Sequence, residues 1–272
     1  MKLGLCIVGC GDFARAMGPM LDEVDLFFAS RDLQRAEAYA RAFHGRGAFG
    51  SYRAAAADPR VLAMYLCTPQ HLHLEHALLA ARAGKHVLVE KPIARTLKEA
   101  QQMVSQARQA GVILMVAENH RFMPAVRGAK ELIESGAVGG LRLIQLQEEA
   151  QFRPTQWRND RELSGGGVLI DGGIHKVDIL IYLTGMPEQV FAAPLPQGLP
   201  GTEGEDGVVV MTRSPDGVVG VINHSWAVAQ RPGPPWVTVS GVGGRIHFEV
   251  GARWLKIDDG NLERTLRYDN DD

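Results

Sequence analysis

Apolar runs alternate with helix-like segments over residues 1–118, and this alternation restricts the possible folds more than any other feature of the chain. The runs are rich in Val, Ile, Leu and Phe and end in turn residues, as buried strands do. Strands this apolar need cover on both faces, so the pattern predicts a doubly wound parallel sheet with helices on each side. The expected strands are 3–9, 24–30, 61–69, 86–90 and 112–118.

The segments between these runs have the amphipathic, alanine-rich character of helices. Thr96 stands where a helix would be capped, and Gly84 and Gly111 stand where helices would stop. The alternating part of the chain therefore consists of βαβ units. The expected helices are 12–21, 32–43, 71–84 and 96–111.

The composition is that of an ordinary globular protein, with 46% apolar residues, 22% charged residues and a net charge of −2. That charge argues against nucleic acid as a partner. No stretch approaches the ~20 apolar residues of a membrane span, and the N-terminus lacks a signal peptide pattern. Cys6, Cys10 and Cys67 fall in or beside apolar runs without CxxC spacing, which predicts reduced core residues, no disulfide framework or zinc site, and a cytoplasmic protein.

The pattern changes after residue 118. One helix is expected over 121–139, and residues 141–152 alternate as a half-exposed strand does. Three hairpins are expected at 207–226, 236–250 and 253–268, and a proline- and glycine-rich surface loop at 191–207. This texture predicts an α+β domain with an open, mainly antiparallel sheet. We therefore expect a dinucleotide-binding domain at 1–118 and a substrate-binding and oligomerisation domain at 119–272.

The first turn carries a nucleotide-binding signature. Gly9, Gly11 and Ala14 fit G-x-G-x-x-A, between an expected strand and an expected helix. Gly9 would permit the tight turn, Gly11 would let a pyrophosphate approach the backbone, and Ala14 would let the helix pack closely. Free N–H groups at the helix start would then hold phosphates. The alternative is a glycine turn of purely structural use.

The end of the second expected strand bears on which dinucleotide is bound. NAD enzymes usually place an acidic residue there, to bond the ribose 2′-hydroxyl. Here Ser30 and Arg31 occupy the place, and an acid follows only at Asp32. A hydroxyl and a guanidinium would bind a 2′-phosphate, so NADP is favoured over NAD. Alternatively, these residues simply open the next helix.

A glycine cluster leads into an apolar segment over residues 164–185. Asp171, His175 and Asp178 stand at i, i+4 and i+7, so they would share one face of a helix. Asp171 and His175 could then point into one cleft. The structural alternatives are that Asp171 caps the helix and that His175 is a core histidine. For Asp178 a structural role is favoured.

These segments resemble one known family. "IVGCGDFA", "CTPQHLHLEHALLAARAGKHVLVEKPIA" and "GGGVLIDGGIHKVDIL" are similar to the glucose–fructose oxidoreductase, inositol dehydrogenase and MocA (Gfo/Idh/MocA) family. The resemblance covers most of residues 3–185, with T-P-x-x-x-H, A-G-K-H-V, E-K-P and D-x-x-x-H motifs in the family's order. It implies hydride transfer between NADP or NAD and a carbinol or carbonyl carbon of a sugar, cyclitol or related small molecule. It also implies a homo-oligomer, a dimer or tetramer assembled through the second sheet.

The resemblance also assigns roles to residues. Lys91 would be the E-K-P lysine near nicotinamide and substrate, and Asp171 and His175 would be the catalytic pair. The substrate side would be Arg121, Trp157 and Arg158 together with those three. The cofactor side would be Gly9, Gly11, Asp12, Phe13, Ser30, Arg31, Thr68, Pro69, His73, Glu90, Lys91 and Asn119.

This chemistry is consistent with the residue types. A histidine suits proton transfer with a hydroxyl near neutral pH, and a fixed ammonium can stabilise negative charge on the reacting oxygen. Asp171 could orient His175 or bond a substrate hydroxyl. One rival is a nucleotide-binding regulatory or scaffold protein without turnover. The other is a metal site at His71, His73 and His76, whose spacing does not put all three on one helical face, so no metal is expected.

Overall fold

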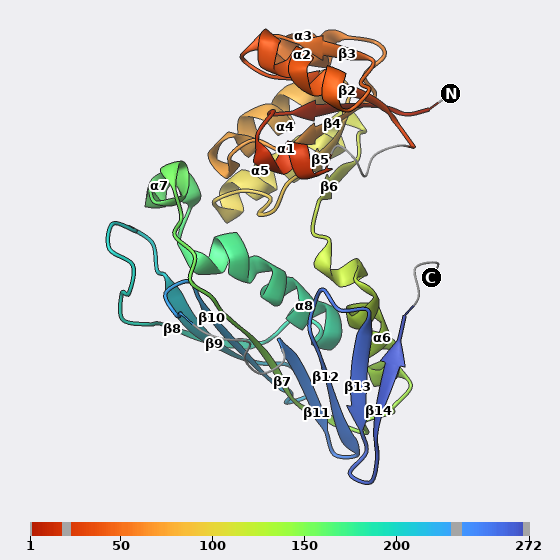
Figure 1. Cartoon of the computed structure of the whole chain (residues 1–272), viewed down its shortest axis with the longest axis vertical. Helices are drawn as coiled ribbons and strands as arrows, with labels where there is room; N and C mark the ends of the chain where they lie inside the picture. The colour runs from red at the N-terminus through yellow and green to blue at the C-terminus, as the bar shows by residue number, and fades with distance from the viewer. Residues whose placement is uncertain (1, 18–22, 230–235, 269–272) are drawn as a thin grey trace. The chain divides into compact units, whose positions relative to one another are not determined.

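The computed structural model describes residues 2–17, 23–229 and 236–268 (Figure 1). The chain divides into two compact units. The first unit comprises Met1–Ala117 with Leu163–Gly165, and the second comprises Glu118–Glu162 with Gly166–Asp272. Among the described residues, no helix has both the length and the apolar character needed to cross a membrane.

The first unit is built on a sheet whose neighbouring strands all pair in parallel. The strand order β3-β2-β1-β4-β5-β6 is that of two mononucleotide-binding halves meeting at β1. The predicted doubly wound fold is confirmed. The strands are β1 Gly4–Val8, β2 Asp25–Ala29, β3 Gly47–Phe49, β4 Ala63–Leu66, β5 His86–Val89 and β6 Leu114–Val116.

Both faces of this sheet are buried. Along β1, Cys6 and Val8 belong to one core cluster, whereas Leu5 and Ile7 belong to another. Because side chains alternate along a strand, this division means that helices cover both faces. The helical elements are α1 Asp12–Met17, α2 Leu33–Ala42, α3 Tyr52–Ala57, the 3-10 turn η2 Gln70–Leu72, α4 His73–Arg82 and α5 Leu97–Ala110.

The helix ends of this unit follow the sequence signals. Thr96 caps α5, where its Oγ1 accepts the Glu99 N–H at 3.2 Å, and Gly111 ends the helix with φ of 67°. The elements β3 and α3 have no counterpart among the predicted elements, so the sheet has one strand more than expected. The helix expected at 71–84 is divided into η2 and α4, and part of the helix expected at 12–21 lies outside the described residues.

The second unit carries a mixed sheet of order β14-β13-β12-β11-β7-β10-β9-β8. All its neighbouring strands are antiparallel except β7 and β10, which pair in parallel. The predicted open, mainly antiparallel sheet is confirmed. The strands are β7 Leu141–Glu149, β8 Gln189–Pro194, β9 Gly207–Arg213, β10 Val219–Ser225, β11 Val237–Gly241, β12 Gly244–Phe248, β13 Trp254–Asp258 and β14 Glu263–Arg267.

Helices α6 and α8 pack against each other, and α8 also contacts β7 and β10 of this sheet (Figure 1). Gly220 on β10 permits the approach of α8, because a Cβ there would lie 2.7 Å from the Leu180 Cδ1 atom. The helical elements outside the first sheet are η3 His120–Phe122, α6 Pro124–Glu134, η4 Gln156–Arg158, α7 Arg161–Ser164, the π-helical turn η5 Leu169–Gly173 and α8 Ile174–Thr184.

Three expectations for this half need correction. The helix expected over 121–139 is shorter and follows a separate 3-10 turn, because Pro124 starts a new helix. The loop expected at 191–207 begins inside β8, which pairs with β9 although most of its residues are exposed. The helix expected to carry Asp171 and His175 on one face begins with a π turn, which changes the angle between them.

Candidate active site

The glycine turn of the first unit has the shape that a dinucleotide phosphate requires. Gly9 has φ of 97°, and a Cβ there would lie 2.9 Å from the Thr68 Cγ2 atom. A Cβ at Gly11 would meet nothing within 4 Å, so open space lies beside the backbone at this position. Ala14 is fully buried under the turn, and the Tyr39 hydroxyl donates to the Gly11 carbonyl at 3.1 Å. The turn therefore fits a pyrophosphate.

Ser30 and Arg31 follow β2, and neither of them caps α2. Asp32 is the cap, accepting the Arg35 N–H at 3.3 Å, while the Ser30 oxygen accepts the Asp32 N–H at 3.2 Å. The Ser30 hydroxyl keeps its own proton for donation, and Arg31 is exposed. Asp32, the acid nearest the expected ribose site, thus already caps α2.

Three other cofactor candidates are exposed or only partly buried. Asp12 opens α1, and the Phe13 side chain is 44% exposed in the same helix. Asn119 is exposed just before η3, in the second unit. All three side chains are therefore accessible from solvent.

Thr68 and Pro69 follow β4, and a buried histidine holds their segment. The Thr68 Oγ1 lies 3.1 Å from the His76 Nδ1. Burial, with smaller contributions from His73, Arg31 and His71, lowers the pKa of His76 to about 4. His76 is therefore a neutral hydrogen-bonding partner near pH 7.

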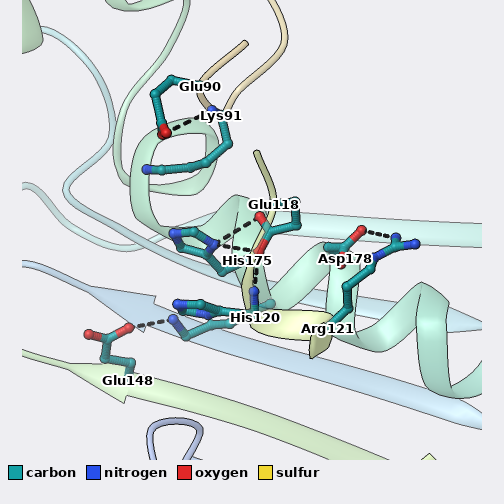
Figure 2. Close-up of polar contacts among 9 residues, drawn as sticks. Glu90, Lys91, Glu118, His120, Arg121, Glu148, His175 and Asp178 are labelled. Carbon is teal, nitrogen blue, oxygen red and sulfur yellow. Dashed lines mark hydrogen bonds and ion pairs between the residues drawn. The ribbon is translucent and has the colours of Figure 1, made fainter. Parts of the chain in front are cut away.

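Lys91 lies between two residues whose polar groups are fixed. The Glu90 carboxylate accepts the Tyr65 hydroxyl at 2.5 Å. It also accepts the Lys91 N–H at 3.3 Å (Figure 2). On the other side, the Pro92 carbonyl lies 3.0 Å from the His73 Nδ1, and the His73 Nε2 lies 2.9 Å from the Thr68 carbonyl. Glu90 and His73 are 8% and 1% exposed. The backbone of Lys91 is thus held from both sides.

His73 ties the Lys91 segment to the Thr68 segment. Because carbonyl oxygens only accept hydrogen bonds, the neutral ring donates at one nitrogen, and it donates at both only when protonated. Burial lowers the pKa of His73, although the carbonyls of Thr68 and Pro92 oppose that effect. His73, predicted to lie beside the cofactor, is thus a buried link within the first unit.

In the second unit, His175 has a carboxylate partner that the sequence did not single out. The His175 Nδ1 lies 2.8 Å from each carboxylate oxygen of Glu118 (Figure 2). The Glu118 Oε1 also accepts the His120 N–H at 3.0 Å, and the His120 ring stacks on the His175 ring with centroids 3.8 Å apart. Burial raises the pKa of Glu118, but the hydrogen bond and charge of His175 outweigh it and hold that pKa below its usual value.

Asp171 lies in the π turn and pairs with a different residue. Its Oδ2 accepts the Arg158 Nε–H at 3.1 Å, and the Arg158 guanidinium lies 4.6 Å from the centre of the Trp157 ring. Asp171 is predicted to orient His175 or to bond a substrate hydroxyl, and the described partner of the His175 Nδ1 is Glu118. The structure groups Asp171, Arg158 and Trp157, all expected on the substrate side.

Two further ion pairs surround His175 on α8. Asp178 accepts hydrogen bonds from the Arg121 guanidinium, so both are part of the contact between α8 and η3. Lys176 is 1% exposed, donates to the Glu148 Oε2 at 2.5 Å and lies 4.4 Å from the centre of the Trp236 ring. Arg121, expected to bind substrate, thus already has a carboxylate partner, as the structural alternative for Asp178 suggested.

The described residues contain one group with spacing suitable for a metal ion. Glu118, His120 and His175 offer ligand atoms within 4.8 Å of one another. The two rings are stacked with only 18° between their planes, so their lone pairs lie in two nearly parallel planes and do not converge on one point. Hydrogen bonding to Glu118 suits this geometry better than a shared metal. Of the three histidines at 71, 73 and 76, His73 and His76 form described hydrogen bonds to Thr68 and Pro92.

Two family models cover most of the chain. Residues 3–118 match the model described as "Oxidoreductase family, NAD-binding Rossmann fold". Residues 126–247 match the model described as "GFO/IDH/MocA C-terminal domain". The chain belongs to the Gfo/Idh/MocA oxidoreductase family. The family resemblance and the nicotinamide cofactor, NAD or NADP, inferred from the sequence are both confirmed.

Named members of the Gfo/Idh/MocA family are similar to this chain. A trans-1,2-dihydrobenzene-1,2-diol dehydrogenase of Mus musculus is 37% identical over 71% of this chain and 57% of its own length. A levoglucosan dehydrogenase of Pseudarthrobacter phenanthrenivorans is 33% identical over 79% of this chain and 62% of its own length. The chain thus spans about three fifths of these relatives.

A solved structure of levoglucosan dehydrogenase in complex with NADH and levoglucosan is also similar to this chain. It matches with a TM-score of 0.87 and 27% identity, over 98% of this chain and 80% of that one. The Gfo/Idh/MocA architecture is therefore shared over nearly the whole of the present chain.

Sequence reasoning missed Glu118, Tyr65, Glu148 and Lys176 of this Gfo/Idh/MocA protein. The sequence predicts Glu118 as the last residue of an apolar strand. A carboxylate that ends such a strand, directly before Asn119 and Arg121, was the available signal. Its partner, however, lies 57 residues further along the chain.

Proposed function

We propose that this protein is an NADP-dependent oxidoreductase that interconverts a carbinol and a carbonyl group on a sugar, cyclitol or related polyol. The supporting observation is that the two motif residues expected to act on the reacting oxygen, Lys91 and His175, are each held by buried polar groups. The relatives named for levoglucosan and a dihydrodiol favour a cyclic substrate with neighbouring oxygen atoms.

A bound nicotinamide would supply the hydride acceptor or donor, and the glycine turn, Ser30, Arg31 and Thr68 would hold its dinucleotide. During oxidation, the His175 Nε2 takes the hydroxyl proton of the substrate, and during reduction it returns the proton. The Lys91 ammonium donates to the same oxygen and stabilises the negative charge that develops there. Both groups have to act on one substrate molecule.

The group of Asp171, Arg158 and Trp157 would bind the rest of the substrate. A carboxylate and a guanidinium offer an acceptor and several donors for hydroxyl groups, while the indole face suits the apolar C–H surface of a sugar ring. Arg121 would contribute to the same side while it remains paired with Asp178. The first unit, with residue 118 as its expected boundary, binds the cofactor, and the rest of the chain binds the substrate.

Assembly and location belong to the same proposal. Val190 and Phe191 on β8 are each 64% exposed and lie beside Met211 of β9, in a shallow hollow of about 420 Å³. An apolar strand surface of this kind favours a homo-oligomer assembled through the second sheet, which light scattering in solution would test. The three cysteines are free, which is typical of a reducing cytoplasm.

The test is a panel of cyclic polyols and the corresponding ketones, scored by the absorbance of the reduced cofactor with NADPH and NADH in parallel. We expect turnover on at least one sugar-like substrate, with a Michaelis constant for NADPH at least about 10-fold below that for NADH, as a charge-assisted phosphate contact would give. A clear preference for NADH would contradict the NADP assignment. Cofactor binding without turnover on any member of the panel would favour the regulatory alternative.

A further inference from the structure

The proposed mechanism needs one nitrogen of His175 fixed toward the substrate, and the contacts of the second unit provide for this. An ionised carboxylate can only accept hydrogen bonds, so the Nδ1 that lies 2.8 Å from both oxygens of Glu118 must carry a proton. In the neutral ring the Nε2 is then left with its lone pair. The contact therefore selects one tautomer of the imidazole.

Glu118 is itself well fixed as an anion. Its side chain is 10% exposed, and the backbone N–H of His120 donates to one of its oxygens at 3.0 Å. The stacked His120 ring covers one face of His175 and restricts its rotation about χ2. Carboxylate and ring stack therefore fix both the position and the orientation of the imidazole.

The other charged groups around His175 are already paired. Asp178, on the same helix, is bound by Arg121 of η3, and Lys176 is bound by Glu148 of β7 and covered by Trp236. The ionisable groups with a described contact to the His175 ring are Glu118 and His120. The single anion in that contact is Glu118.

We propose that Glu118 is the positioning residue of His175: it holds the Nδ1–H tautomer, so that the Nε2 exchanges the proton with the substrate, and it stabilises the imidazolium formed during oxidation. The proton that leaves the substrate hydroxyl goes to the Nε2, and the Nδ1 proton stays between His175 and Glu118 throughout. This inference rests on the proposed function for its catalytic consequence, but the tautomer itself is a property of the resting protein.

The first test needs no turnover. In protein with ¹⁵N-labelled histidine, long-range proton–nitrogen spectra at pH 8 distinguish the two neutral tautomers, and a His175→Asn variant identifies the signals. We expect wild-type His175 to be protonated at Nδ1 and Glu118→Ala to populate the Nε2–H form. A wild-type ring protonated at Nε2, or a tautomer that does not respond to Glu118→Ala, would overturn the proposal.

The second test uses the pH profile of kcat. Glu118→Gln keeps the size of the side chain but removes its charge, so kcat should fall about 100-fold, within the range of general acid–base contributions. The limb of the oxidation profile that reports the base should move to lower pH, because the imidazolium loses its anionic partner. Glu118→Asp should recover part of kcat. A Glu118→Gln profile that coincides with that of the wild type would count against the proposal.

Asp178→Asn is the matched control. Asp178 lies on the same helix and also ties α8 to η3, but its described partner is Arg121 rather than a histidine. Asp178→Asn should change neither the His175 tautomer nor the pH profile of kcat. Equal effects of Asp178→Asn and Glu118→Gln on both would show that Glu118 only joins α8 to its neighbours and does not position His175. Should the wild type turn over no polyol at all, the proposed function fails, while the tautomer measurement still decides the role of Glu118.

Discussion

The two units hold their proposed catalytic groups in different ways. The first fixes Lys91 through its backbone, between the anchored carboxylate of Glu90 and the anchored carbonyl of Pro92. The second fixes His175 through its side chain, by a hydrogen bond to Glu118, 57 residues earlier. A parallel sheet brings successive loops to one edge, so a short motif there is held by its neighbours. A helix face needs a partner that folding brings from elsewhere.

The buried histidines differ as well. His73 and His76 in the first unit have pKa values lowered mainly by burial, so their neutral forms are preferred in the folded protein. In the second unit the pKa of Glu118 is lowered by His175, so its anionic form is preferred. In the first unit, neutral histidines form hydrogen bonds to the segments of Thr68 and Lys91. In the second unit, an anionic Glu118 lies beside His175, the proposed proton-transferring ring.

The largest expected effect is that of Lys91→Met. This change leaves the backbone contacts of residue 91 intact but removes the ammonium, so kcat should fall about 1000-fold, as for loss of one stabilising donor at a developing anion. Steady-state kinetics with the best polyol of the panel measures this, with the fold checked by circular dichroism. Lys98→Met, at an exposed position of α5, is the control. Near-normal turnover in Lys91→Met would refute the role of the lysine.

A smaller effect is expected when the support of Lys91 is broken. His73→Gln leaves the Pro92 or Thr68 carbonyl without its ring contact, which should cost about 1–3 kcal/mol of unfolding free energy. Because Lys91 adjoins Pro92, kcat should also fall, by about 10-fold, through misplacement of the ammonium. Denaturant unfolding and kinetics on the same samples test both.

The matched control for that variant is His44→Asn. His44 is exposed in the same unit and has φ of 53°, a backbone conformation that asparagine tolerates. Loss of stability in His73→Gln with unchanged kcat would show that the first unit does not position its lysine through this histidine.

The smallest expected effect is a pH dependence of stability confined to the first unit. The folded pKa of His76 is about 4, against the ordinary histidine value of 6.5, so the unfolded chain binds more protons between those values. Stability contributed by neutral His76 is therefore present above pH 6.5 and lost as pH falls toward 4. Between pH 7.5 and 5 the loss is about 2 kcal/mol.

Urea unfolding at the two pH values measures this loss, and His76→Gln should reduce it while His44→Asn should not. Glu118 acts at lower pH, because its folded pKa lies below the ordinary glutamate value of 4.5 and its contribution is lost only as pH falls below that value. An unchanged pH dependence in His76→Gln would show that burial of this imidazole does not distinguish the first unit.

The fold of the first unit could be predicted from the sequence, whereas that of the second unit could be predicted only in outline. The strands β1, β2, β4, β5 and β6 are short apolar runs, and Thr96 and Gly111 mark the ends of α5 by local chemistry. The strand β3 has three residues and no apolar run, and β8 is mostly exposed, so both depend on pairing with a neighbour. Such pairing leaves little trace in the sequence of the strand itself.

The sequence by itself determined the doubly wound domain and the glycine turn, because these depend on local periodicity and on residue types at fixed spacing. The family motifs predicted Lys91, Asp171 and His175 as site residues. Only the tertiary structure decided which group faces which: Glu118 at His175, Arg158 at Asp171, and His73 between Thr68 and Pro92. The physical reason is that a hydrogen bond needs atoms within about 3 Å. For residues far apart in the chain, that distance is set by the packing of whole elements.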